Sequence, residues 1–149
     1  NAQITRKIMK YAIVHGVCDV IRWLYEQNKN IDLHCNNEWA LRCAGRNGNY
    51  LMMYDVYHLD CKADIHINND NVLLETLKHH DGTNILNLYD LIDDPYDIYR
   101  NDCFIFKECL RFDRRIAIEW FLEKDKRYDD VFLTEFPEST KYIKIDYTY

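Results

Sequence analysis

Cysteine and histidine are the side chains of this chain that could carry chemistry, and each occurs six times in 149 residues. A structural zinc site needs paired ligands at short, fixed spacing, and the sequence contains no Cys-x-x-Cys. The closest pairs are His34 with Cys35, His79 with His80, and Cys103 with Cys109. We therefore expect neither a metal site nor a cofactor.

A nucleophilic cysteine is the second kind of site to consider, because Cys103 lies near an expected helix start. A reactive thiol needs a nearby base and a lowered pKa, and nothing in the sequence places a His beside Cys103. The chain also lacks a glycine-rich phosphate loop, Gly-x-Ser-x-Gly and His-Glu-x-x-His. We therefore expect that the protein is not an enzyme.

The six cysteines could in principle form disulfides. They are Cys18, Cys35, Cys43, Cys61, Cys103 and Cys109. We expect them to lie on different helices and loops, which favours free thiols in a reducing compartment. A cytoplasmic location is predicted, because the chain shows neither a signal segment nor a run of 18 apolar residues that could span a membrane.

The elements that must position these side chains follow a repeat of about 32 residues. One marker is an Asn that returns at intervals of 32 and 32, at Asn37, Asn69 and Asn101. A second marker is an Asp that returns at intervals of 32, 33 and 32, at Asp32, Asp64, Asp97 and Asp129. A residue inserted between Lys78 and Thr83 explains the longer interval. Such a period predicts stacked units that cannot bury their apolar faces alone.

Each unit contains two apolar patterns with spacings of one, three and four residues, which are helical. The second pattern is Val20-Ile21-Leu24, then Met52-Met53-Val56, Ile85-Leu86-Tyr89 and Ile116-Ala117-Trp120. This register places Trp120 in the core. Gly16 and Gly48 stand between the two patterns, where a left-handed residue can end the first helix.

We therefore predict that each unit is a helix, a turn, a second helix and a short extended stretch. Asn can cap the next helix. The acidic residue that follows favours the positive end of the helix dipole. These acidic residues are Glu38, Asp70 and Asp102.

The second unit reads Asn-Glu-Trp-Ala-Leu-Arg-Cys-Ala-Gly-Arg-Asn-Gly from residue 37 to residue 48 and resembles an ankyrin repeat. Leu41, Ala44 and Gly48 match the family pattern, whereas Arg42 replaces the family His. The stretch Ala63-Asp64-Ile65 resembles the Gly-Ala-Asp-Val that follows the second helix in that family. This resemblance, which covers residues from about 4 to about 125, implies an all-α, ankyrin-like repeat solenoid of about four helix-turn-helix units.

The sequence pattern Asn-Asn-x-x-Ala-Leu-Arg-x-Ala is most similar to the divergent ankyrin repeats encoded by large and giant DNA viruses. Richness in Asn, Ile, Tyr and Asp fits an AT-rich genome. This resemblance implies a viral protein that binds a host factor in the host cytoplasm.

The expected domain organisation is a repeat domain at residues 1–136 and a tail at 137–149. The units are expected at about 4–36, 37–68, 69–100 and 101–136. In the tail, Tyr and Ile nearly alternate with polar residues, which predicts a short strand or a segment docked on another surface. The net charge of −6 disfavours nucleic-acid binding.

Function is therefore expected on a surface, as a non-catalytic protein–protein interaction module. Trp39 has Asn71 and Cys103 as its expected equivalents, which are not consistently apolar, so we place it at the edge of a groove. The expected partner-binding residues are His34, Asn36, Trp39, Arg46, Asn47, His66, Asn68, Asn71, Lys78 and His79. Trp39 and Arg46 are the expected anchors, because aromatic and Arg side chains dominate interface energetics. The alternative is a structural component of a virion or another assembly.

Overall fold

The computed structural model describes residues 2–60, 63–79, 81–92, 99–128, 130 and 134. Within these ranges it is all-α, with eight bounded helices and no strand. The helices are α1 (Ala2–His15), α2 (Cys18–Gln27), α3 (Cys35–Arg46), α4 (Tyr50–Leu59), α5 (Ile67–Lys78), α6 (Thr83–Leu91), α7 (Arg100–Arg111) and α8 (Arg115–Lys124). The predicted all-α class is confirmed for this part of the chain. Asp97, Asp129 and the tail at 137–149 lie outside the described residues.

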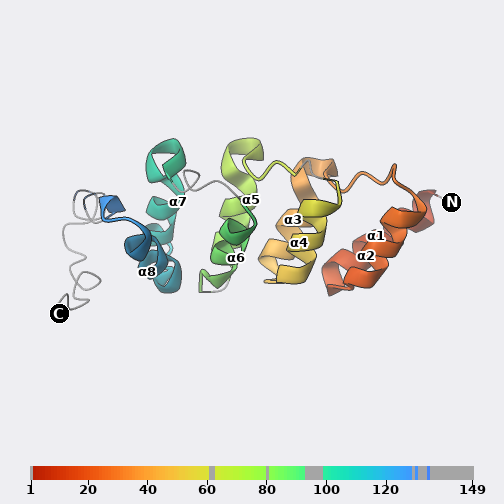
Figure 1. The fold of residues 1–149 in the computed structure, drawn as a ribbon, viewed down its shortest axis with the longest axis horizontal. Coiled ribbons are helices and arrows are strands. Elements are labelled where there is room, and N and C mark those ends of the chain that lie inside the picture. The colour runs from red at the N-terminus through yellow and green to blue at the C-terminus, as the bar shows by residue number, and fades with distance from the viewer. Residues whose placement is uncertain are drawn as a thin grey trace.

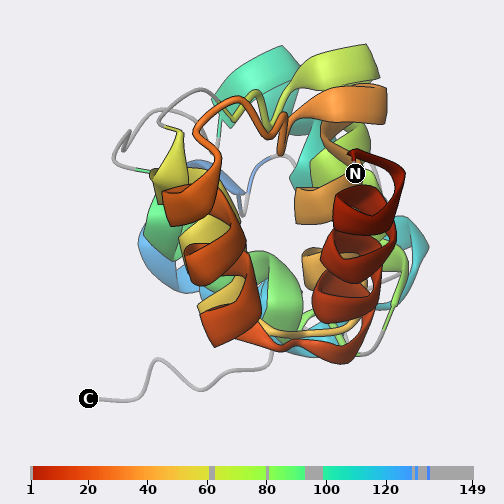
Figure 2. The same cartoon turned by 90° about the vertical axis from the view of Figure 1, so that its right-hand side faces the viewer.

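The helices form four hairpins stacked side by side (Figure 1). A view along the stack shows two columns, with α1, α3, α5 and α7 in one and α2, α4, α6 and α8 in the other (Figure 2). Each helix contacts its hairpin partner and the equivalent helix of the neighbouring hairpin. The architecture is therefore that of a helical repeat, in which the core is a strip shared between neighbours.

The core repeats at intervals of 32, 33 and 32 residues along the chain. In the second-helix column the same position is held by Leu24, Val56, Tyr89 and Phe121, all of them buried. The prediction that Trp120 shares this position is therefore off by one residue. Trp120 is half-buried and stacks on Tyr89, with a distance of 5.6 Å between the ring centroids.

The turns within the hairpins follow the prediction. Gly16 and Gly48 have left-handed φ angles of 68° and 66°, and Asp113 has 52° at the same place in the fourth hairpin. The N–H after each of these residues bonds to the carbonyl five residues earlier, as Asn49 does to Ala44 at 3.0 Å, which ends the first helix in a Schellman motif. The α5–α6 connection, residues 79–82, is one residue longer than the α3–α4 connection, residues 47–49, so the predicted insertion is confirmed.

The start of each first helix differs from the prediction. Three consecutive left-handed residues open α3, α5 and α7, at positions 36–38, 68–70 and 101–103. This conformation destabilises most residues by roughly 1–2 kcal/mol each, and Asn and Asp tolerate it best. Seven of these nine residues are Asn or Asp. The Asn-rich sequence therefore builds a left-handed turn and is not a set of helix caps.

The positions of the left-handed turns show that the predicted register of the fourth unit is wrong by one residue. They align Asn101 with Asn36 and Asn68, and not with Asn37 and Asn69. Cys103 therefore stands where Glu38 and Asp70 stand in earlier units. Asp102 lies one residue before the position that Glu38 and Asp70 hold in their units. Its side chain is 88% exposed and pairs with Lys107. The equivalent of Trp39 in this register is Phe104, and not Cys103.

Close packing between α3 and α5 depends on Gly45. A Cβ atom at Gly45 would lie 2.2 Å from Oγ1 of Thr76. We expect Gly45→Ala to lower the free energy of unfolding by about 1–3 kcal/mol through overpacking, although alanine favours a helix interior by roughly 1 kcal/mol. Urea unfolding of Gly45→Ala, Thr76→Ala and the double variant measures this. Thr76→Ala should recover part of the loss, and a more stable single Gly45→Ala variant would contradict the predicted contact.

Candidate functional site

The expected partner-binding residues lie at both ends of the first-helix column. His34, Asn36, Trp39, His66, Asn68 and Asn71 lie at the end that carries the left-handed turns, whereas Arg46, Asn47, Lys78 and His79 lie at the other. Trp39 and Arg46 are seven residues apart on α3, which places them on one helix face, separated by about 10 Å along the axis.

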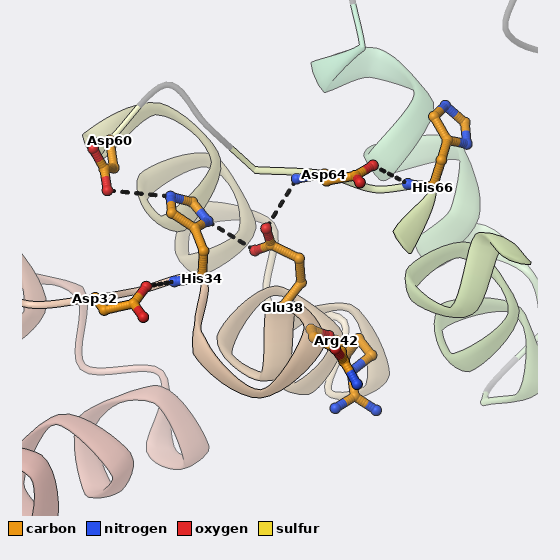
Figure 3. A network of polar contacts seen from close by, with 8 residues as sticks. Asp32, His34, Glu38, Arg42, Asp60, Asp64 and His66 are labelled. Atoms are coloured by element: carbon orange, nitrogen blue, oxygen red, sulfur yellow. Dashed lines mark hydrogen bonds and ion pairs between the residues drawn. The ribbon is translucent and has the colours of Figure 1, made fainter. Parts of the chain in front are cut away.

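His34 belongs to a buried polar network at the junction between the second and third hairpins (Figure 3). Its Nδ1 lies 2.8 Å from Oε2 of Glu38, and its Nε2 lies 3.5 Å from Oδ2 of Asp60. The other Glu38 oxygen, Oε1, accepts a hydrogen bond of 2.9 Å from the backbone N–H of Asp64. Glu38 is only 2% exposed. Its carboxylate therefore ties the left-handed turn of one unit to the linker that enters the next.

The next junction repeats this arrangement. Nδ1 of His66 lies 2.5 Å from Oδ1 of Asp70, which is also buried. Oδ2 of Asp70 accepts a hydrogen bond of 2.9 Å from the side-chain amide of Asn101 in the following unit. Asp32 and Asp64 complete the pattern, because each accepts the backbone N–H of the His two residues later, at 2.9 Å.

His34 and His66 are therefore parts of the junctions, with side chains that are only 14% and 17% exposed. Each is the partner of a buried carboxylate, and a buried charge must be hydrogen-bonded. We therefore no longer include these two residues in the candidate surface. The sequence held a signal of this role, since Asp-x-His is followed four residues later by an acid in both units.

Aromatic rings form the junction between the fourth hairpin and the residues that follow α8. Tyr99 replaces the His, and its hydroxyl donates a hydrogen bond of 2.6 Å to Oδ2 of Asp125. Its ring stacks on the fully buried Tyr128 at 5.6 Å. Hydrogen bonds from Arg127 and then from Tyr99 hold the pKa of the Asp125 carboxyl below its ordinary value, and burial raises the pKa of the Tyr128 phenol.

At the opposite end of the column, side chains of each hairpin bond to the last carbonyls of the preceding first helix. The Asn47 amide donates to Val14 O at 3.3 Å, and the Asn84 amide donates to Gly45 O at 3.0 Å. Arg114 does the same through Nε, to Leu77 O at 2.9 Å. These carbonyls lie in the last turn of a helix, where the regular partners four residues later are missing, and Gly45 O also accepts the backbone N–H of Gly48 at 3.1 Å. Asn47 is thus exposed and also part of a junction.

One row of positions along the first-helix column is basic, with the acidic Glu75 and Glu108 beside it. The positions equivalent to Trp39, Arg42 and Arg46 carry seven Lys or Arg residues among twelve and no Asp or Glu. We call these twelve positions the basic row: Lys7, Lys10 and Val14; Trp39, Arg42 and Arg46; Asn71, Leu74 and Lys78; Phe104, Lys107 and Arg111. The expected set held four of them. It omitted Arg42, Lys107 and Arg111, although spacings of three and seven residues could have identified them.

Neighbouring groups hold several of these cations in place. Arg46 pairs with Glu75 at 3.1 Å, Lys107 with Asp102 at 2.8 Å, and Arg111 with Glu108 at 3.4 Å. Arg42 donates to the carbonyls of Asn36 and Asn37 at 3.0 and 2.9 Å. Nζ of Lys10 lies 5.9 Å from the centre of the Trp39 ring, within reach of a cation–π interaction.

Other site chemistry can be assessed for the described residues. Among them, no group of three or more His, Cys, Asp or Glu is placed to hold a metal ion. Cys103 is not activated, because burial and the nearby Asp102 raise the pKa of its thiol. The five cysteines in this part of the chain are free thiols. None of the described helices is long and apolar enough to cross a bilayer.

Comparison of the chain with protein-family models, with curated proteins and with solved structures finds no match.

The buried carboxylate of Glu38 yields a direct test of the junction. Glu38→Ala leaves His34 and the N–H of Asp64 without their acceptor, and a buried group that loses its partner destabilises by about 1–3 kcal/mol. We expect a loss in that range in urea unfolding. Glu119→Ala, which removes an exposed carboxylate from α8, is the matched control and should change stability by less than about 0.5 kcal/mol. Equal effects of the two substitutions would contradict a structural role for Glu38.

Proposed function

We propose that this protein is a non-catalytic protein-binding module whose partner lies along the basic row. The observation that supports this proposal is the sign of the charge. Seven cations and no anion occupy twelve equivalent outward positions in a chain whose net charge is −6. Trp39 and Phe104 add aromatic surface beside these cations, and aromatic and Arg side chains are enriched in interface hot spots.

An acidic protein segment is the partner chemistry that complements this row. Opposite charge speeds association and favours the right partner over wrong ones. A nucleic acid fits less well, because the acidic remainder of the protein would repel a phosphate backbone. Arg46, Lys78 and Arg111 present one cation from each of the second, third and fourth hairpins in a single line. Neighbouring helices lie roughly 8–10 Å apart. A segment in the polyproline II conformation, which rises about 3.1 Å per residue with three residues per turn, would match them with an acidic residue at every third position.

The repeat is also the basis for proposing an ankyrin-like solenoid. Hairpins of helices with a period of about 32 residues support that assignment, as do Leu41, Ala44 and Gly48 in the second unit. The left-handed turns that open α3, α5 and α7 differ from the Asn caps predicted there. The viral origin and the location in the host cytoplasm rest on the sequence resemblance, and with them the partner would be a host protein.

A structural role in an assembly is the second candidate, and the first hairpin favours it. Ile4, Ile8 and Tyr11 are 56%, 42% and 64% exposed on the outer side of α1. Ile8 is equivalent to Ala40, Val72 and Ile105, which are buried. The outer side of α1 thus presents exposed apolar side chains that an assembly contact would cover.

Affinity capture from cells with the wild-type chain and a Trp39→Ala, Arg46→Ala variant tests the module. We expect a protein that the wild type captures and the variant loses, since removal of an interface anchor weakens binding by roughly 2 kcal/mol or more, or about thirtyfold. A Tyr54→Ala, Lys124→Ala variant is the control, because it removes an exposed aromatic ring and a cation from the second-helix column. Circular dichroism checks that all three chains are folded.

A third variant, Ile8→Glu with Tyr11→Glu, decides between the two candidates. Suppose that the Trp39→Ala, Arg46→Ala variant and the Tyr54→Ala, Lys124→Ala control both retain the partner, whereas the third variant loses it. This result would contradict binding along the basic row and favour an assembly contact on the outer side of α1.

A further inference from the structure

A cleft of about 570 Å³ lies between the N-terminal half of α1 and the linker that leads from α2 into α3. Its lining includes Ala2, Arg6 and Lys10 of α1, together with Asn28, Asp32 and Asn36 of the linker and the left-handed turn. The cleft therefore belongs to the first junction of the stack, at the end that carries the left-handed turns.

The repeat register shows which groups fill this place in the next unit. Ala2, Arg6, Asn28 and Asp32 lie 32 residues before His34, Glu38, Asp60 and Asp64. Those four residues form the polar network of the second junction, in which the Glu38 carboxylate joins His34 to the backbone N–H of Asp64. The first junction has an arginine at the position of the carboxylate and an alanine at the position of the histidine.

The cleft is consequently a junction without its carboxylate. α1 has no acidic residue in its first turn, and it continues as a regular helix where α3 and α5 have left-handed turns. No ion pair involves Arg6 in the part of the chain that the structure describes, and Lys10 contacts the Trp39 ring. Asp32 is the anionic group of the lining, and its Oδ1 already accepts the N–H of His34 at 2.9 Å.

We propose that this cleft binds a carboxylate supplied by a ligand. Arg6 and Lys10 are the cations that would pair with it. The backbone N–H of Asp32 would donate to it, as the N–H of Asp64 donates to Glu38 in the next unit. A charge-assisted hydrogen bond to a carboxylate is stronger than a neutral one, and an arginine binds a carboxylate with two parallel N–H groups. The inference rests on the junctions. Lys10 belongs to the basic row as well, whereas Arg6 and the backbone N–H of Asp32 do not.

A carboxylate can come from an acidic side chain of a polypeptide or from a small carboxylic acid. The test is therefore an NMR titration of the full chain with two probes, N-acetylglutamate N-methylamide and glutarate. N-acetylglutamine N-methylamide is the uncharged control of nearly the same shape. We expect saturable shifts of the backbone amides of Arg6, Asp32 and Asn36 with the glutamate probe, with a dissociation constant of about 1 mM, and none with the glutamine probe.

Variants assign the effect to the cleft. Arg6→Gln with Lys10→Gln should weaken binding at least about tenfold, as expected when charge-assisted hydrogen bonds are lost. Arg115→Gln with Lys124→Gln, which removes the same two positive charges from exposed positions on α8, should leave it unchanged. Arg6 and Lys10 are exposed, so the variants should remain folded, which their amide spectra report directly.

The titrations support or overturn the proposed carboxylate site as follows. Tighter binding of the glutamate probe than of glutarate supports the proposal with an acidic side chain as the ligand, and the reverse order supports it with a small carboxylic acid. Shifts that do not saturate at the cleft amides would overturn it. So would equal shifts with the glutamine probe, or equal binding by the double variant and the wild type.

Discussion

The stacking of the second, third and fourth hairpins depends on a carboxylate buried at each junction between them. Glu38 and Asp70 are each 2% exposed, and a buried charge destabilises a fold strongly unless it is hydrogen-bonded. Each finds its partners in the His four residues earlier and in a group of the following unit. Apolar helix faces alone allow neighbours to slide, whereas these bonds form at one relative height only. The carboxylate thus fixes the left-handed turn, the linker and the next hairpin together.

Much of this fold could be predicted from the sequence, and the errors have physical causes. The period, the helix pairs and the glycine turns follow from spacing, because helices and left-handed residues constrain residue types strongly. The Asn-Asn-acid segments were misread since Asn and Asp favour both helix caps and left-handed turns. The register of the fourth unit was ambiguous because Asn101 can be aligned with either Asn36 or Asn37, which are neighbours. The Asp-x-His spacing with an acid four residues later marks His34 and His66 in the sequence, whereas the contact of His34 with Asp60 follows only from the fold.

The two ends of the stack are chemically different. At the fourth hairpin the rings of Tyr99 and Phe106 both pack on Tyr128, with centroid distances of 5.6 and 4.7 Å. At the other end α1 exposes Ile8 and Tyr11, and its junction has a cleft in place of a carboxylate. A repeat unit buries its two sides against two neighbours.

The residues of the basic row are largely separate from those that hold the junctions. Arg46 and Arg111 pair with Glu75 and Glu108 on the surface, and exposed ion pairs of this kind stabilise a fold by about 0–1 kcal/mol. An acidic partner could therefore replace these glutamates at little expense in stability. Arg42 is the exception, because its guanidinium bonds to two carbonyls of the left-handed turn. A partner that reached Arg42 would act on the junction itself, which links recognition on this face to the stacking of the hairpins.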